Sequence, residues 1–594
     1  MKKILFIILM FAFAGCTLEE KVISNSTPET YYQTPMQCRT GLNGCYIPLR
    51  SLYGSLAYFE VCEGASDLIY HSTSTMYNSQ CDISQSLPRF GTTMWTQCYT
   101  GVMRCNAMYA AIERAPLTDE EKAPLFAECV ILRAFYYYIL TINFGDVPYY
   151  WEEVTDANND KISQLPRMSA VDLRNELMDQ LWYWLGDENV GEEGGCQQAL
   201  PYIKTYDPSN EYRIGSMVGF VLAGKLAMWN KQWNKAIKFY KYVEDVYGCI
   251  DVDSEEGTYT PMNSLLGYSL ADVKFRNRYT PESIFELPAY AKEYGLRVTS
   301  TIAVRCTPPR SSSETEGDDG EVFVEEDETM DLAKRDDIYN GIVIPELGGE
   351  ARTYSPFRPT KYFYETLMSY DASKDLRTSV YNAATLNSNP QEPPVAIEGS
   401  SGSLAWCYSG WQKGVKRDPE TRLLHWFSSV GKTTGRPFLG DKFWCPGMVY
   451  TQDSNNIKIF RFASVILDLA EAHMRMDDKD TAVGYLNATK LRAGVTTVNP
   501  NTEEEFMEEL YAESGRELFG EFTRRHNLVR WGIWYDQVIN HATYPTSSGT
   551  KESHCDIYTH VQPYPCREYY PIPDQQIVLS NYNLSNPEYE KYGL

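Results

Sequence analysis

Hydrophobic and polar residues alternate along much of the chain with the period of an α-helix, most clearly in AECVILRAFYYYILTINFGDVPYY at residues 127–150. Its apolar side chains recur every three or four positions, which places them on one face of a helix. They are Ala127, Val130, Ile131, Ala134, Phe135, Tyr138, Ile139 and Ile142. Gly145 is suited to end the helix, and Pro148 prevents it from resuming. The pattern predicts a buried helix.

Charged residues also lie in and beside this run. Glu128 and Arg133 fall inside it, and Asp146 follows it. We interpret Arg133 as a structural residue, with Glu128 and Asp146 as its candidate partners and not as catalytic acids.

The same periodicity predicts two helices nearer the N-terminus. One begins near Pro35, after a capping region at Thr27 and Thr30. The other covers MWTQCYTGVMRCNAMYAAIERA at residues 94–115 and stops before Pro116. Trp95 and Tyr99 belong to its helical stripe and are assigned to the scaffold.

Two longer stretches each predict a pair of helices joined by a tight turn, at residues 214–248 and 460–494. In the first pair the small residues let the helices approach closely, and Trp229 is again assigned to the scaffold. The small residues are Gly219, Ala223, Gly224 and Ala227. Helical pairs of this size resemble tetratricopeptide repeats, which stack to bury faces that none could bury alone.

The character of the sequence changes between residues 255 and 440, where helical periodicity fades and Gly, Pro, Ser and Thr become frequent. The acidic segment SSSETEGDDGEVFVEEDETMD lacks the spacing of a calcium-binding loop and is interpreted as a solvated surface loop. We therefore predict a mainly α fold, a tetratricopeptide-like helical-repeat scaffold with a loop-rich, irregular insertion that carries the ligand contacts.

The charge of the chain restricts its partners. Its 594 residues carry a formal net charge of −25, which argues against nucleic acid because phosphate binding depends on Lys and Arg. The 45 Tyr and 12 Trp residues favour neutral, partly apolar ligands, since each ring combines a flat face with a polar group.

The first residues predict export and attachment to a membrane. MKKILFIILMFAFAGC has two lysines, an apolar stretch too short to span a bilayer, and small residues before Cys16. This resembles a lipoprotein signal in which Cys16 is lipidated. The expected segments are a signal peptide at 1–15, a lipidated tether at 16–26, an N-terminal helical region at 27–254, the insertion at 255–440 and a C-terminal helical region at 441–594.

The cysteines give two alternatives. Cys38 and Cys45 are seven residues apart, as are Cys98 and Cys105, so the two members of each pair are too distant to bond with each other. Antiparallel packing of the two helices would pair Cys38 with Cys105 and Cys45 with Cys98. The favoured alternative is that these are buried free thiols.

Several motifs together resemble the SusD/RagB family over most of the chain. They are ETYYQTPMQCRTGLNGCY, the residues Trp95, Tyr99 and Asn106, LRAFYYYILTINFGDVP, GKLAMWNKQWNKA, ESIFEL, KDLR, FRFASVILDLAEAH, LRAGV, AESGRELFGEFTRRHNLVRWG, YYPIPDQQI and NPEY. In AESGRELFGE, Ser514 and Gly515 stand where the family usually carries a further charged residue, which puts ion pairing in that helix in doubt.

The resemblance implies a surface lipoprotein without catalytic activity that captures nutrients, mostly glycans. It implies a SusC-like TonB-dependent barrel as partner, with the chain acting as the lid. The acidic pair Glu19–Glu20 after Cys16 resembles the signal that sends such lipoproteins to the cell surface of Bacteroidetes. We therefore expect a lipid-anchored protein exposed at the outer membrane.

Oligosaccharide binding needs aromatic planes for the C–H face of a sugar and polar groups for its hydroxyl rim. Three segments offer both: EGASDLIYHSTSTMYN, ELPAYAKEYG and WCYSGW. The candidate ligand-binding residues are Asp67, Tyr70, Tyr77, Tyr290, Tyr294, Trp406, Tyr408 and Trp411. Core packing is the alternative role for each aromatic residue.

Two other functions remain open at this point. Peptide capture, as by RagB-like relatives, is compatible with the acidic chain. A surface glycoside hydrolase is less favoured, because no GxSxG, HExxH or P-loop motif is present and paired carboxylates would arise by chance among 79 acidic residues. No cofactor or metal is expected: the cluster His554, Cys555 and His560 fits no standard zinc spacing.

Overall fold

The structure is a computed structural model of the chain. It describes residues 28–64, 66–71, 83–186, 199–200, 213–248, 259–270, 275, 277–289, 300, 302–306, 357–360, 362–367, 375–378, 409–412, 415–417, 424–426, 436–439, 441–443, 445, 453–542 and 564–594.

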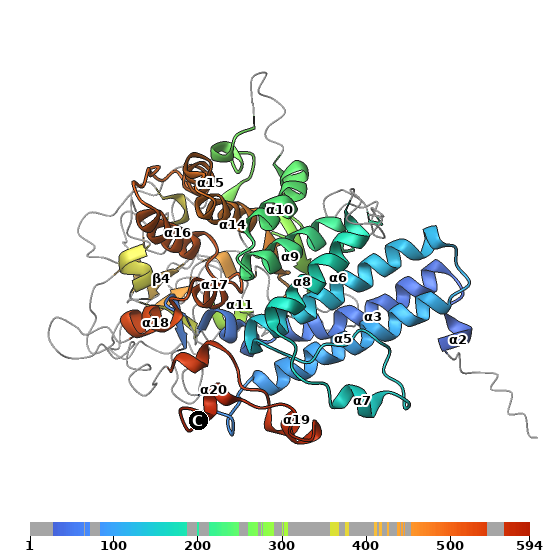
Figure 1. Cartoon of the computed structure of the whole chain (residues 1–594). Coiled ribbons are helices and arrows are strands. Elements are labelled where there is room, and N and C mark those ends of the chain that lie inside the picture. The colour runs from blue at the N-terminus through green and yellow to red at the C-terminus, as the bar shows by residue number, and fades with distance from the viewer. Residues whose placement is uncertain are drawn as a thin grey trace, which may run out of the picture.

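Helices dominate the described part of the chain (Figure 1). The longer ones are α3 (Pro35–Tyr53), α5 (Gly91–Arg114), α6 (Asp119–Phe144), α8 (Ala170–Leu185), α9 (Ser216–Trp229), α10 (Trp233–Tyr247), α14 (Phe462–Arg475), α15 (Lys479–Arg492), α16 (Glu503–Glu517), α17 (Arg524–Trp531) and α18 (Trp534–Ala542). Shorter ones are α2 (Pro28–Tyr31), α4 (Leu56–Phe59), η1 (Glu60–Gly64), α7 (Asn159–Ser163), η4 (Pro261–Asn263), α11 (Ile302–Cys306), η7 (Tyr362–Leu367), η8 (Leu376–Thr378), η9 (Asp441–Phe443), η11 (Pro565–Glu568), α19 (Asp574–Leu579) and α20 (Pro587–Glu590).

The strands are short and pair two by two, each pair antiparallel. The pairs are β1 (Ile69–His71) with β3 (Phe357–Pro359), β2 (Ser283–Leu287) with β8 (Ile457–Arg461), β4 (Ser409–Gln412) with β7 (Arg436–Leu439), and β5 (Val415–Arg417) with β6 (Leu424–Trp426).

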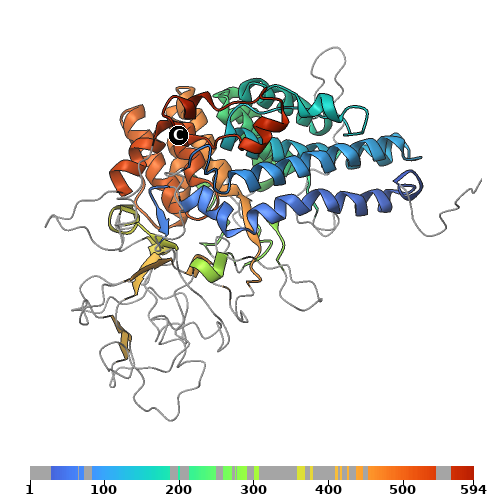
Figure 2. The same ribbon diagram turned by 90° about the horizontal axis from the view of Figure 1, so that it is seen from below.

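Successive helices pack against one another and form the predicted helical-repeat scaffold. The chain of contacts runs from α3 to α5, α6, α8, α9, α10, α14, α15 and α16. Figures 1 and 2 show α3 and α5 lying side by side and extending away from the C-terminal helices. The small residues of the α9–α10 pair allow this contact, because a Cβ added at Gly224 would lie 2.2 Å from the ring of Tyr240.

The helix predicted from residues 127–150 is confirmed, but its burial extends around the whole circumference. It begins earlier, at Asp119, where Thr118 and Glu121 form a capping box, and ends at Gly145 with φ of +70°. Among the described helices α6 is long and apolar enough to cross a membrane, yet 94% of its apolar window is buried inside the protein. Contacts with α3, α5, α8 and α9 explain this, since they surround α6.

The start of the first long helix is also confirmed at Pro35, although the cap differs from the expected one. Thr34 accepts a hydrogen bond from the backbone N–H of Gln37 at 3.3 Å, whereas Thr30 lies inside α2 and Thr27 lies outside the described residues. The second helix begins at Gly91, three residues before the predicted Met94, and ends before Pro116 as predicted.

The expected partners of Arg133 are wrong. Its guanidinium donates to the Asn106 side chain at 3.2 Å and to the Gln180 side chain at 2.9 Å. Glu128 instead pairs with Arg213 at 2.7 Å, while Asp146 accepts a hydrogen bond from the first backbone N–H of α8. All three residues make structural contacts, as interpreted, but Glu128 and Asp146 bind other groups and not Arg133.

The four paired cysteines are buried free thiols, so the favoured alternative is confirmed and the two proposed disulfides are wrong. Two contacts show that Cys45 lies opposite Cys105 in the antiparallel helices. Gly41 faces Met108, and the Arg104 guanidinium donates a hydrogen bond to the Gly44 carbonyl. Hydrogen bonds from the thiols of Cys105 and Cys129 lower the pKa of Cys45 to about 5.

A buried ion-pair network joins the C-terminal helices to the insertion, so the doubt about ion pairing in AESGRELFGE is wrong. Glu513, Glu517 and Glu521 are spaced four residues apart and are almost completely buried. Their basic partners come from several segments: Arg377, Lys442, Arg461, Lys490, Arg492 and Arg516. Gly515 lies beside a different ion pair, since a Cβ there would lie 3.3 Å from the guanidinium of Arg524, the partner of Asp67.

Candidate ligand-binding face

Three of the candidate binding residues fall within the described part of the chain: Asp67, Tyr70 and Trp411. The others, Tyr77, Tyr290, Tyr294, Trp406 and Tyr408, lie outside the described residues, as does the lipidation candidate Cys16.

Asp67 lies in the interior and its carboxylate is already bound. The side chain is completely buried, and its oxygens accept hydrogen bonds from Nε and Nη2 of Arg524 at 2.8 and 2.7 Å. Its carbonyl oxygen accepts a third bond from the Thr360 hydroxyl at 2.5 Å. Asp67 therefore fixes the start of β1 and has no free oxygen directed to the surface.

The strands bring Tyr70 and Trp411 into one series of neighbouring strands. Tyr70 lies on β1, opposite Arg358 of β3, and Trp411 lies on β4, opposite Pro437 of β7. Contacts between β3 and β7 connect the two pairs. We call the series β1–β3–β7–β4 the strand ribbon. It joins two of the three segments that the sequence singled out, although they are more than 300 residues apart.

A third feature lies beside the strand ribbon and was missed by the sequence reasoning. Tyr362, just after β3, stacks on His541 near the end of α18, with ring centroids 3.5 Å apart. The aromatic group KYFYETL was a weak signal for Tyr362. No pattern marked His541, because nothing in the sequence of α18 relates it to the insertion.

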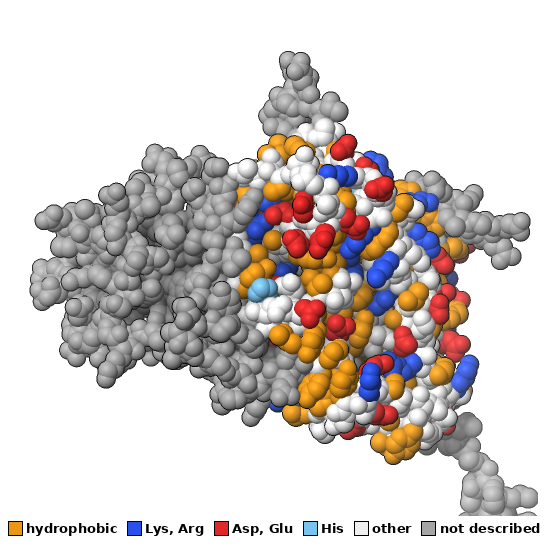
Figure 3. All heavy atoms as spheres, turned by 60° about the vertical axis from the view of Figure 1, so that its left-hand side comes forward, with side chains coloured by type: hydrophobic (Ala, Val, Ile, Leu, Met, Phe, Trp, Pro, Cys, Tyr) orange, Lys and Arg blue, Asp and Glu red, His pale blue; other side chains and the backbone are white. Residues whose placement is uncertain are grey.

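The surface on this side of the molecule has a mixed character. Figure 3 shows acidic, basic and hydrophobic side chains interspersed on the described part of this face. The described part of this face has no extended basic area of the kind that binds a polyanion.

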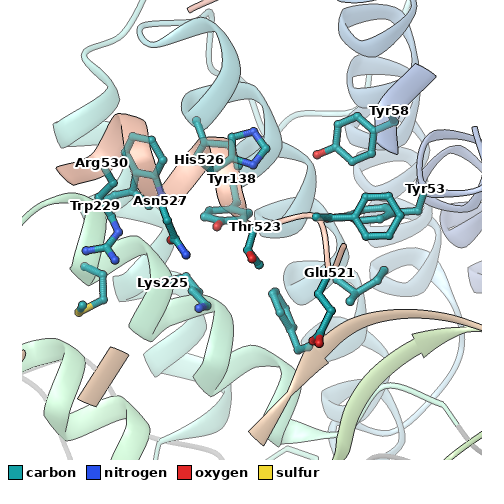
Figure 4. A pocket seen from close by; sticks show the side chains of 15 residues that line it. Tyr53, Tyr58, Tyr138, Lys225, Trp229, Glu521, Thr523, His526, Asn527 and Arg530 are labelled. Atoms are coloured by element: carbon teal, nitrogen blue, oxygen red, sulfur yellow. The ribbon is translucent and has the colours of Figure 1, made fainter. Parts of the chain in front are cut away.

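A separate cavity lies between the N-terminal helices and α17, and it is too small for a sugar (Figure 4). Its volume is about 30 Å³, room for one or two water molecules, whereas small-molecule sites measure roughly 300–1,000 Å³. The lining residues are Tyr53, Tyr58, Tyr138, Ile142, Lys225, Met228, Trp229, Ile459, Phe460, Glu521, Phe522, Thr523, His526, Asn527 and Arg530.

The charged groups around this cavity are already paired. Lys225 binds Asp468 at 2.6 Å, and Arg530 binds Glu471 at 2.7 Å. Burial and the nearby charge of Arg525 lower the pKa of His526 to about 3, so its imidazole is neutral. The cavity is therefore part of the protein core and not a candidate sugar site. Trp229 contributes to its wall and has Arg174 over its ring at 4.9 Å, in keeping with the scaffold role assigned to it.

The described residues contain no cluster of metal-ligating side chains. In that part of the chain no group of three or more His, Cys, Asp or Glu side chains could hold a metal ion. The cluster His554, Cys555 and His560 lies outside the described residues.

Comparison with known proteins identifies similar sequences at both ends of the chain. The model of the SusD family matches residues 447–589, and a model described as starch-binding associating with outer membrane matches residues 53–179. SusD-like protein P25 of Formosa agariphila is 23% identical over 561 residues, which cover 90% of each chain.

Solved structures share the fold at low sequence identity. A SusD homolog from Bacteroides thetaiotaomicron is 18% identical, with a TM-score of 0.63 over 93% of this chain and 97% of that one. Surface glycan-binding protein A from Bacteroides thetaiotaomicron, solved in complex with laminarihexaose, is 17% identical. Its TM-score is 0.57, over 93% of this chain and 99% of that one.

Proposed function

We propose that this chain, which belongs to the SusD/RagB family, captures an oligosaccharide at the cell surface. It then delivers the oligosaccharide to a SusC-like TonB-dependent barrel. In this proposal Cys16 carries the lipid that anchors the chain to the outer membrane, and the chain binds without catalysing a reaction. The observation that carries the proposal is similarity along almost the whole chain to a glycan-binding protein with laminarihexaose bound.

The strand ribbon supports a neutral glycan as the ligand. Tyr70 and Trp411 lie on β1 and β4, the two outer strands of this series, and in this proposal their aromatic rings contact the C–H faces of different sugar residues. The net charge of −25 disfavours sulfated or uronic-acid glycans, because like charges repel at close range. Tyr77, Tyr290, Tyr294, Trp406 and Tyr408 complete the proposed set of contacts.

A binding experiment tests this directly. The purified chain is applied to an array of neutral and acidic glycans beside a peptide library, and each hit is measured by calorimetry. We expect binding to neutral oligosaccharides, weakened about tenfold or more by Trp411→Ala, which corresponds to about 1.4 kcal/mol. Trp151→Ala is the matched control, because Trp151 is 55% exposed in the segment between α6 and α7, away from the strand ribbon in the sequence.

Two outcomes would overturn the proposal. Heats with peptides and with no sugar would favour the RagB-like alternative of peptide capture. Sustained turnover of labelled glycans would favour a surface hydrolase.

The barrel partner is tested by mild extraction of native membranes. We expect the chain to co-purify with a TonB-dependent barrel in a detergent that preserves complexes, and Cys16→Ser to release it from the membrane fraction. A lipid-free monomer recovered without a barrel would contradict both the anchor and the partnership.

A further inference from the structure

Tyr362 and His541 form a ring pair that joins η7 to α18. Their rings are nearly parallel, with an interplanar angle of 14°, and both side chains are half-buried. They come from segments 179 residues apart, so the pair forms only when the insertion lies against the C-terminal helices.

Buried contacts at the segment between β3 and η7 hold the pair beside the strand ribbon. Thr360, at the end of β3, donates to the Asp67 carbonyl and accepts from the N–H of Phe363 at 3.1 Å. The Asp67–Arg524 ion pair lies close enough to influence the titration of both rings. These contacts join the segment that precedes Tyr362 to Asp67 and, through Asp67, to Arg524.

The polar atoms of the pair remain available. Among the described residues, neither the Tyr362 hydroxyl nor the His541 ring nitrogens have a hydrogen-bond partner. Both residues are half-buried, so part of the ring pair is exposed to solvent. Burial raises the pKa of Tyr362 to about 12 and lowers the pKa of His541, so both rings are uncharged at neutral pH.

Uncharged rings with free polar atoms have the chemistry that a sugar requires. The phenol offers a donor and an acceptor, and a neutral imidazole offers one of each. The C–H groups of a pyranose can pack against the rings while its hydroxyls bond to these atoms.

We propose that Tyr362 and His541 form one wall of the ligand-binding site and contact a neutral sugar residue beside the strand ribbon. This inference rests on the proposed function, because it assigns two further residues to the same site. The sugar packs on the ring pair, and its hydroxyls bond to the Tyr362 oxygen and to a His541 nitrogen.

Three variants test the wall by calorimetry with a neutral oligosaccharide selected on the array. Tyr362→Phe keeps the stacked ring and removes only the hydroxyl, while His541→Ala removes the second ring. His473→Ala is the control, because His473 also packs against a tyrosine, Tyr485 at 5.6 Å, but on α14 and α15. We expect each of the first two variants to weaken binding about fivefold or more, and the control to bind like the wild type.

A second measurement remains informative if His541→Ala fails to fold. Carbethoxylation of histidines in the wild-type chain, located by mass spectrometry, should fall at His541 when the oligosaccharide is present and stay constant at His473. Two results together would contradict the proposed contact of Tyr362 and His541 with the sugar: wild-type affinity in Tyr362→Phe, and equal labelling of His541 with and without sugar. The proposed function would remain intact. A wild-type chain that binds no glycan at all would overturn both.

Discussion

Replacing Glu517 by Ala is expected to lower the free energy of unfolding by about 3–5 kcal/mol, because it leaves buried guanidinium groups without their counter-charge. Glu517 is completely buried and contacts Arg377 at 3.2 Å, Arg461 at 2.8 Å and also Arg492. These arginines reach it from the insertion, from β8 and from α15. Urea titration followed by circular dichroism measures the change.

The control for this prediction is an exposed ion pair of similar geometry. Arg114 and Glu153 are 2.7 Å apart, with 49% and 31% of their side chains exposed. Arg114→Ala should cost less than about 1 kcal/mol, because water already solvates both charges. An equal decrease in the free energy of unfolding in the two variants would show that the buried network contributes no more to stability than an exposed ion pair.

Acidification is expected to weaken the fold between pH 4.5 and 2. Burial by itself raises the pKa of Glu517, but the charges of Arg492, Arg461 and Arg377 outweigh it and bring the pKa from 4.5 down to about 2. The pKa of Glu513 is lowered in the same way by Arg377, Arg516 and Lys490, against the effect of burial.

The sign follows from these lowered values. A carboxylate whose pKa is lower in the folded state stabilises the fold above its unfolded pKa, and this contribution disappears as protons bind. Glu517 alone accounts for about 3 kcal/mol, lost as the pH falls from 4.5 to 2.

Unfolding measured at intervals across this range should show a steep decline in the wild type and a shallower one in Glu517→Ala, which has lost one of the titrating groups. Identical slopes in the two proteins would contradict the assignment of the lowered pKa to Glu517.

Local features of the scaffold were predictable because they depend on nearby residues. The apolar spacing and Gly145 were enough to place the end of α6, and the small residues of α9 were enough to predict its close contact with α10. The burial of α6 on all sides was not predictable, since it depends on which helices surround it.

The ion pairs of the buried glutamates could also be predicted only in part from the sequence. Glu513, Glu517 and Glu521 stand four apart in the sequence, so their common face was visible. Their partners lie up to 140 residues away, and no local pattern connects Arg377 with Glu517.

At the candidate site, the composition of the loops led to Tyr70 and Trp411. Composition could not predict that their two segments belong to one series of strands, which only the structure shows. Asp67 looked like an available polar residue in a loop. Its partner Arg524 is 457 residues further along the chain, so only the folded structure reveals that its carboxylate is already bound.

The ladder between β2 and β8 has a consequence for how such proteins diversify. Leu287 and Ile457 are paired across it, so the chain leaves the scaffold and returns to it at neighbouring positions. Between these points it is fastened again at β3 and at Arg377. Lengthening a loop with fixed ends costs little free energy. The stretches on either side of these fastenings can therefore change independently during evolution, and ligand preference can diverge while the helices stay the same.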